Sequence, residues 1–192
     1  MNYLFIILLF LLFLFLQSHN EPFKNSNTNF YNKKLKDTQN VNNILLSGTI
    51  SEEQVKYFFD TFKEAKIYIL NEDKTTTYKI EEKSDIKSIK IVTEYPYDNN
   101  IISLFQKSNV LFDIIICSDI NTIENMIYVI KSYPILLTNK SIIIIEDIQS
   151  YVDASKIIDN FPENLKNEIF IYDNRRTKVD SNDIKIYYEN YF

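Results

Sequence analysis

The scarcity of glycine constrains this chain more than any other feature of its sequence. The 192 residues contain one glycine, Gly48, where ordinary usage would give roughly a dozen. Loops that bind phosphates, or that let a ligand approach the main chain, need glycine because it adopts positive φ angles and carries no side chain. The chain therefore has neither a G-x-G-x-x-G fingerprint nor a Walker loop.

Histidine and cysteine are equally scarce, which limits the chemistry available to the folded part. The only histidine is His19, at the edge of an N-terminal apolar segment, and the only cysteine is Cys117. A closed Cys/His zinc site and the Ser-His-Asp and Cys-His nucleophile systems are therefore excluded. Cys117 follows three isoleucines. We expect it to be a small buried group rather than a reactive thiolate, which needs a cationic neighbour or a helix N-terminus.

The charge of the chain argues against a nucleic-acid partner. The formal net charge is −5, with acidic and basic residues interleaved, whereas a nucleic-acid surface would present a basic face. Apolar residues make up 45% of the sequence, which is enough for the core of one domain of about 150 residues.

The N-terminus predicts a targeting segment. Residues 3–16 form an unbroken apolar run, which as a helix would span about 21 Å, short of the ~30 Å hydrocarbon core of a bilayer. Residues 1–19 are therefore interpreted as a signal peptide or as an uncleaved signal anchor that inserts residues 3–16 into a membrane. Residues 20–40 are polar and rich in Asn and Lys, and predict a flexible linker. We expect a membrane-anchored or secreted protein whose folded domain spans residues 41–192.

Within residues 41–192, strand and helix patterns alternate. Residues 112–117 and 141–146 are β-branched runs typical of central parallel strands. A helix is predicted from Ser51, a natural N-cap, with Val55, Phe58 and Phe59 on one face. Further strands are expected over residues 43–47, 66–70, 88–93, 168–172 and 183–188, and further helices over 99–108, 122–137 and 151–159. This alternation predicts a doubly wound α/β sheet.

Ligands of such sheets bind beyond the carboxyl ends of the strands. Four segments of this chain are expected to meet there, and they carry most of the candidate chemistry. They are residues 48–50, 71–73, 117–119 and 146–147.

Five short motifs, in order along the chain, resemble those of one family. They read I-L-L-S-G from residue 44, I-Y-I-L-N from 67, F-D-I-I-I-C-S-D from 112, I-E-D-I-Q-S-Y from 145 and I-Y-D-N-R from 171. They are similar to motifs of class I S-adenosylmethionine-dependent methyltransferases, in the branch of macrolide- and cephalosporin-tailoring O-methyltransferases. The resemblance implies a Rossmann-like, mostly parallel sheet with a C-terminal antiparallel strand.

The resemblance also implies which positions bind the cofactor, and at most of these positions the chain has a different residue type. In the family, an acidic residue and glycines of the first motif help to hold the methyl donor, where this chain has Leu46 and, further on, Ser51 and Glu52. The family's ribose-binding Asp is replaced by Asn71, beside Glu72. Gly48, Asn71 and Glu72 are the remaining candidates for binding S-adenosylmethionine.

The metal-binding part of the family pattern is also reduced. The paired Asp after the fourth strand are Cys117 and Ser118 here, and the family histidines fall on Asn121 and Gln149. Glu146 and Asp147 remain as catalytic or metal-binding candidates, because two carboxylates at a strand end can hold Mg²⁺, with Asp119 as a third ligand. The simpler interpretation, which we favour, is that Asp147 caps the following helix and Glu146 is solvated.

Three functions are consistent with the sequence. We favour a catalytically inactive methyltransferase-fold domain that binds no cofactor and acts as a binding or structural module for an unidentified protein partner. Its crevice beside Gly48 would be blocked by Leu46, Glu52 or Ile120. The first alternative is a divergent, active O-methyltransferase that uses S-adenosylmethionine and a metal at Glu146 and Asp147. The second is a membrane-tethered or secreted structural protein.

Overall fold

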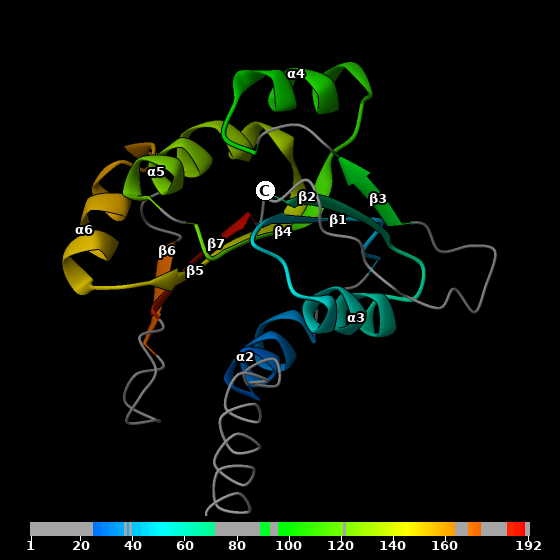
Figure 1. Cartoon of the computed structure of the whole chain (residues 1–192), viewed down its shortest axis with the longest axis horizontal. Helices are drawn as coiled ribbons and strands as arrows, with labels where there is room; N and C mark the ends of the chain where they lie inside the picture. Colours follow the sequence, from blue (N-terminus) through cyan, green and yellow to red (C-terminus); the bar gives the residue numbers. More distant parts are fainter. Residues whose placement is uncertain are drawn as a thin grey trace, which may run out of the picture. The chain divides into compact units, whose positions relative to one another are not determined.

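The computed structural model describes residues 25–36, 38, 40–71, 89–92, 96–120, 122–163, 169–173 and 184–190. The chain forms two compact units, Met1–Asp37 and Thr38–Phe192, and the second contains the sheet (Figure 1).

The first unit contains helix α2 (Asn25–Leu35), where we expected part of a flexible linker. The many Asn and Lys residues obscure a short helical pattern, because Tyr31 and Leu35 are one turn apart on one face. Lys33 and Lys34 lie in the last turn, where cations interact favourably with the helix dipole. In the described part of the chain, no helix combines the length and hydropathy needed to cross a bilayer. The apolar run of residues 3–16 lies outside that part.

The second unit is built on a sheet whose described strands run in the order β3-β2-β1-β4-β5-β7-β6. Neighbouring strands from β3 to β5 are parallel, whereas β7 is antiparallel to both β5 and β6. The strands are β1 (Asn43–Gly48), β2 (Lys66–Asn71), β3 (Ile89–Val92), β4 (Phe112–Ser118), β5 (Leu137–Ile148), β6 (Ile169–Asp173) and β7 (Ile184–Asn190). This confirms the doubly wound, mostly parallel sheet with a C-terminal antiparallel strand.

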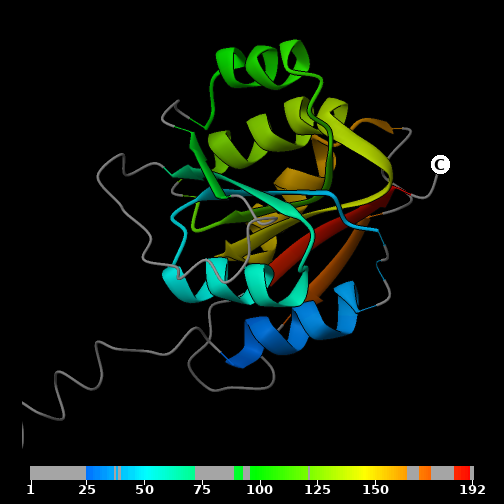
Figure 2. The same cartoon turned by 90° about the vertical axis from the view of Figure 1, so that its right-hand side faces the viewer.

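Helices cover both faces of the sheet, as Figures 1 and 2 show. Helix α3 (Glu52–Thr61) lies on one face, and α4 (Asn99–Lys107), α5 (Ile123–Ser132) and α6 (Tyr151–Asp159) lie on the other. Side chains of Ser51, Asp98, Thr122 and Ser150 cap these four helices by accepting main-chain N–H bonds. The helix expected over residues 122–137 is shorter than predicted, because a 3₁₀ turn (Tyr133–Leu136) containing Pro134 follows α5.

The central strands are buried on both faces. In β4, Ile114, Ile115, Ile116 and Cys117 each have 0% exposure. Ile115 and Cys117 belong to the apolar cluster beneath α4, α5 and α6. Side chains alternate along a strand, so Ile114 and Ile116 point to the face covered by α3. The prediction that β4 and β5 are central strands is confirmed.

Candidate functional site

Gly48 ends β1, where the main chains of β1 and β4 come very close. Its φ is +107°, and a methyl group on its Cα would lie 2.0 Å from the carbonyl oxygen of Ser118. The next residue, Thr49, donates its N–H to the same oxygen at 3.1 Å. The single glycine is therefore required by the contact between two strand ends, which explains its presence without a ligand.

Strand β5 contains a bulge beside the expected site. Ile145 pairs with Ile186 and Ile148 with Ile184, so Glu146 and Asp147 together lie opposite Lys185. Asp147 takes up the extra residue with a φ of +59°. Because of this extra residue, Ile145 and Ile148 both join the cluster beneath α4, α5 and α6. Glu146 follows Ile145 and points by ordinary alternation to the opposite face, the one that α3 covers.

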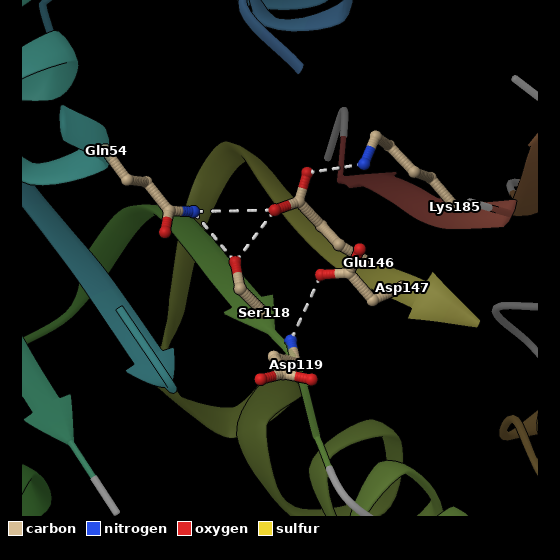
Figure 3. A network of polar contacts seen from close by, with 6 residues as sticks. All are labelled: Gln54, Ser118, Asp119, Glu146, Asp147 and Lys185. Atoms are coloured by element: carbon tan, nitrogen blue, oxygen red, sulfur yellow. Dashed lines mark hydrogen bonds and ion pairs between the residues drawn. The ribbon is translucent and has the colours of Figure 1, made fainter. Parts of the chain in front are cut away.

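Glu146 lies at the centre of a buried network, shown in Figure 3. Its Oε1 atom is 2.9 Å from Nζ of Lys185, and both side chains have 0% exposure. Its Oε2 atom accepts a hydrogen bond from Oγ of Ser118 at 2.7 Å. Nε2 of Gln54, from the first turn of α3, donates to Ser118 Oγ at 2.7 Å and to Glu146 Oε2 at 3.4 Å. We call these four residues the carboxyl-end network.

The network corrects the expectations for Glu146 and Asp147. Glu146 is not solvated, because Lys185 supplies the charge that allows a carboxylate to be buried. Asp147 does not cap α6, since Ser150 is the N-cap and accepts the N–H of Asp153 at 3.1 Å. Asp147 instead accepts the main-chain N–H of Asp119 at 3.3 Å. Asp119 is exposed and has a φ of +50°.

These residues do not fit a magnesium ion. Both oxygens of Glu146 are already engaged, and one of them is paired with an ammonium group that would repel a second cation. Within the described residues, no group of three or more His, Cys, Asp or Glu side chains is arranged to hold a metal. Asp119 and Asp147 meet through a main-chain N–H rather than through two converging carboxylates.

The cofactor candidates lie at the carboxyl ends of β1 and β2. Gly48 pairs with Asn71 across the two parallel strands, and Asn71 is buried. Glu72 lies outside the described residues. Of the three side chains expected to block the crevice, Leu46 and Ile120 are buried and Glu52 is exposed. The side chain of Gln54 reaches the ends of β4 and β5.

Gln54 and Lys185 were missed at the level of sequence, although each carries a recognisable signal. Gln54 shares the buried face of α3 with Val55 and Phe58, a position that helical spacing predicts. Lys185 alternates with Ile184 and Ile186 in a strand buried on both faces. A lysine at such a position requires a buried partner.

Neither Cys117 nor Tyr133 supplies a nucleophile or a base near the network. Burial, and then the charge of Glu146, raise the pKa of the Cys117 thiol, so it stays protonated. Burial is also the main cause that raises the pKa of Tyr133, whose hydroxyl donates to the carbonyl of Pro96 at 2.7 Å. The expectation that Cys117 is a small buried group is confirmed.

No protein-family model matches this chain, and no curated protein matches it in sequence. Solved structures do match. The methyltransferase MycE of the mycinamycin biosynthetic pathway, in complex with Mg, S-adenosylhomocysteine (SAH) and mycinamycin VI, aligns with a TM-score of 0.62 and 14% identity over 88% of this chain. The alignment covers 50% of MycE, so the chain spans about half the length of that enzyme.

Two further structures align over most of their own length. The N-methyltransferase NodS from Bradyrhizobium japonicum gives a TM-score of 0.57 and 11% identity, over 89% of this chain and 98% of NodS. A protein-(glutamine-N5) methyltransferase from Alicyclobacillus acidocaldarius gives 0.54 and 10%, over 84% of this chain and 88% of that enzyme. With the strand order above, these alignments show that the chain has the class I S-adenosylmethionine-dependent methyltransferase fold.

Proposed function

We propose that this protein is a methyltransferase-fold domain that does not transfer methyl groups and acts as a binding or structural module. The observation that carries the proposal is the carboxyl-end network. It occupies the ends of β4 and β5 with side chains that bind one another. In open α/β sheets this edge is where ligands bind.

The chemistry of methyl transfer supports the same conclusion. The reaction needs a donor methyl and an acceptor atom held in line, and a base or a metal to activate the acceptor. Glu146 is paired with Lys185, and the raised pKa of Cys117 keeps that thiol protonated. The N–H of Thr49, which follows Gly48, donates a hydrogen bond to the carbonyl of Ser118, so this N–H already has an acceptor within the fold.

Calorimetric titration of the full chain with S-adenosylmethionine and with SAH tests the proposal. We expect both ligands to bind with a Kd of about 1 mM or weaker. NodS, which has the same fold, serves as the positive control. Binding at micromolar Kd or tighter would contradict the proposal. The variant Gln54→Ala is titrated in the same way. If this variant binds S-adenosylmethionine and the wild type does not, the side chain of Gln54 is what excludes the methyl donor.

A second candidate is a divergent, active O-methyltransferase. Asn71 favours it, because this buried residue lies beside Gly48 at the position where the family resemblance places the ribose acceptor. A metal at Glu146 and Asp147 would have to displace Lys185. Transfer of a labelled methyl group to members of a broad acceptor panel by the wild type, and its loss in Asn71→Ala and Asp147→Ala, would support this candidate. Absence of transfer to every acceptor counts against it.

The membrane-tethered or secreted structural protein rests on the apolar run at residues 3–16, and this placement stays a proposal. Mass spectrometry of the N-terminal peptide of the mature protein distinguishes its two forms. A terminus near residue 20 indicates a cleaved signal peptide, and a terminus at Met1 indicates an anchor.

A further inference from the structure

Lys185 is placed beside Glu146 by the topology of the sheet. Strand β7 is antiparallel to β5, so its first residues lie next to the carboxyl end of β5. Ile184 and Ile186 belong to the apolar cluster on one face, and the side chain between them therefore points to the other face. Glu146 follows Ile145, which belongs to the same apolar cluster, so alternation along the strand points its side chain to the face of Lys185. The ammonium and the carboxylate meet there, 2.9 Å apart.

The pair is sealed from solvent, and neutral side chains bond to its second carboxylate oxygen. Both side chains have 0% exposure. The second oxygen of Glu146 accepts from Ser118 at 2.7 Å, and Gln54 donates to Ser118 at 2.7 Å. Lys185 places an ammonium group against the first oxygen. A buried carboxylate without such a cation is strongly destabilising.

We propose that Lys185 supplies to Glu146 the positive charge that a divalent cation would otherwise have to supply at this strand end. The folded domain consequently needs no metal there and binds none. Removal of the ammonium leaves Glu146, Ser118 and the vacated side-chain volume, which together accept a hard cation such as Mg²⁺ through oxygen ligands and water. This inference goes beyond the proposed function, because it holds whether or not the methyl donor binds.

Thermal unfolding of the full chain tests the inference. Wild type, Lys185→Ala, the double variant Glu146→Gln/Lys185→Ala and the control Lys156→Ala are each measured in EDTA, in Mg²⁺ and in Na⁺ at matched ionic strength. Lys156 is exposed and pairs with the partly exposed Asp153 on α6, so its loss removes a lysine without burying a charge. Binding of Mn²⁺ to each variant is followed by the loss of the free-ion electron paramagnetic resonance signal.

We expect Mg²⁺ to leave the wild type and Lys156→Ala within about 1 °C of the Na⁺ control. Lys185→Ala should unfold about 10 °C lower in EDTA, regain at least half of that loss in Mg²⁺ and bind Mn²⁺. The double variant should show neither the recovery nor the binding, because it lacks the carboxylate.

Four results would overturn the inference. The first is that Mg²⁺ stabilises the wild type beyond the Na⁺ control, and the second is that Lys185→Ala is as stable as the wild type in EDTA. The third is that Mg²⁺ does not restore the stability of Lys185→Ala, and the fourth is that Mg²⁺ restores the double variant equally. If Lys185→Ala does not fold in EDTA, it is refolded from urea with and without Mg²⁺. Recovery of native circular dichroism in Mg²⁺ alone supports the inference, and no recovery contradicts it. Donor binding by the wild type would contradict the proposed function but leave this result unchanged.

Discussion

The two ends of the central strands each hold a carboxylate that joins neighbouring strands, but the two carboxylates are satisfied differently. At the amino end, Asp113 of β4 accepts the main-chain N–H groups of Asn42 at 2.7 Å and Asn43 at 3.0 Å, and the hydroxyl of Thr138 at 2.7 Å. At the carboxyl end, Glu146 of β5 pairs with the ammonium of Lys185 and accepts the hydroxyl of Ser118.

Burial explains the difference. Asp113 is partly exposed, so neutral donors and water suffice for its charge. Glu146 has 0% exposure, and a carboxylate at that depth needs an opposite charge. Sheets of this kind bind ligands at their carboxyl end. In this chain the carboxylate at that end, like Asp113, contacts neighbouring strands of its own fold, which is why we interpret the network as part of the scaffold.

The largest expected effect comes from breaking the carboxyl-end pair. Glu146→Ala removes the carboxylate that pairs with the buried ammonium of Lys185, and we expect a loss of about 3–5 kcal/mol in the free energy of unfolding. Urea unfolding of the full chain measures it. The control Glu64→Ala removes an exposed carboxylate and should change stability by less than about 0.5 kcal/mol. Equal effects of the two substitutions would contradict a structural role for Glu146.

The next effect tests the close approach of β1 and β4 at the same end. Gly48→Ala places a methyl group 2.0 Å from the Ser118 carbonyl at a φ of +107°. We expect a loss of about 3 kcal/mol from strain and overlap, measured by urea unfolding. Asp119→Gly is the matched control, because Asp119 already has a positive φ of +50° and glycine adopts it freely. A Gly48→Ala variant as stable as that control would show that the strand ends can separate.

At the amino end we expect a smaller loss. Asp113→Ala removes the acceptor of three hydrogen bonds, but the partly exposed donors can bind water instead, and the cost should be about 1–3 kcal/mol. The same urea measurement, compared with Glu146→Ala, ranks the two carboxylates. A larger effect of Asp113→Ala would reverse the proposed dependence on burial.

The smallest effect concerns pH. The pKa of the Cys117 thiol is raised in the folded protein, first by burial and then by the charge of Glu146. Its stabilising contribution is therefore complete below the unfolded pKa of about 8.5 and is lost as pH rises above it, by up to about 1.4 kcal/mol per pH unit. Urea midpoints between pH 8 and 10 measure this slope, which should be shallower in Cys117→Ala. An unchanged slope would assign the pH dependence to other groups.

Much of the fold could be predicted from sequence because its signals are local. The β-branched runs ending in Cys117 and Glu146 identify buried strands wherever they pair, and Ser51 caps α3 with neighbours in the next turn. The methyltransferase motifs gave the correct fold for a similar reason, since they lie at the ends of these strands. Helix α2 was missed because its apolar residues are few among many Asn and Lys.

The candidate site could not be predicted in the same way. Gln54 and Ser118 are 64 residues apart, and Gln54 and Glu146 are 92 apart, so their contacts depend on the strand order and on the placement of α3. Alternation after Ile145 places Glu146 on the face that α3 covers, but periodicity does not reveal the one-residue bulge that turns Ile148 back to the other face.

By itself, the sequence determined which segments are buried, which chemistries are excluded by one glycine, one histidine and one cysteine, and which fold results. Only the tertiary structure decided that Glu146 is paired with Lys185 rather than solvated, and that Gly48 lies against Ser118. The physical reason is that burial and helix capping follow from neighbours along the chain, whereas the balance of a buried charge depends on which distant strand brings the opposite charge within reach.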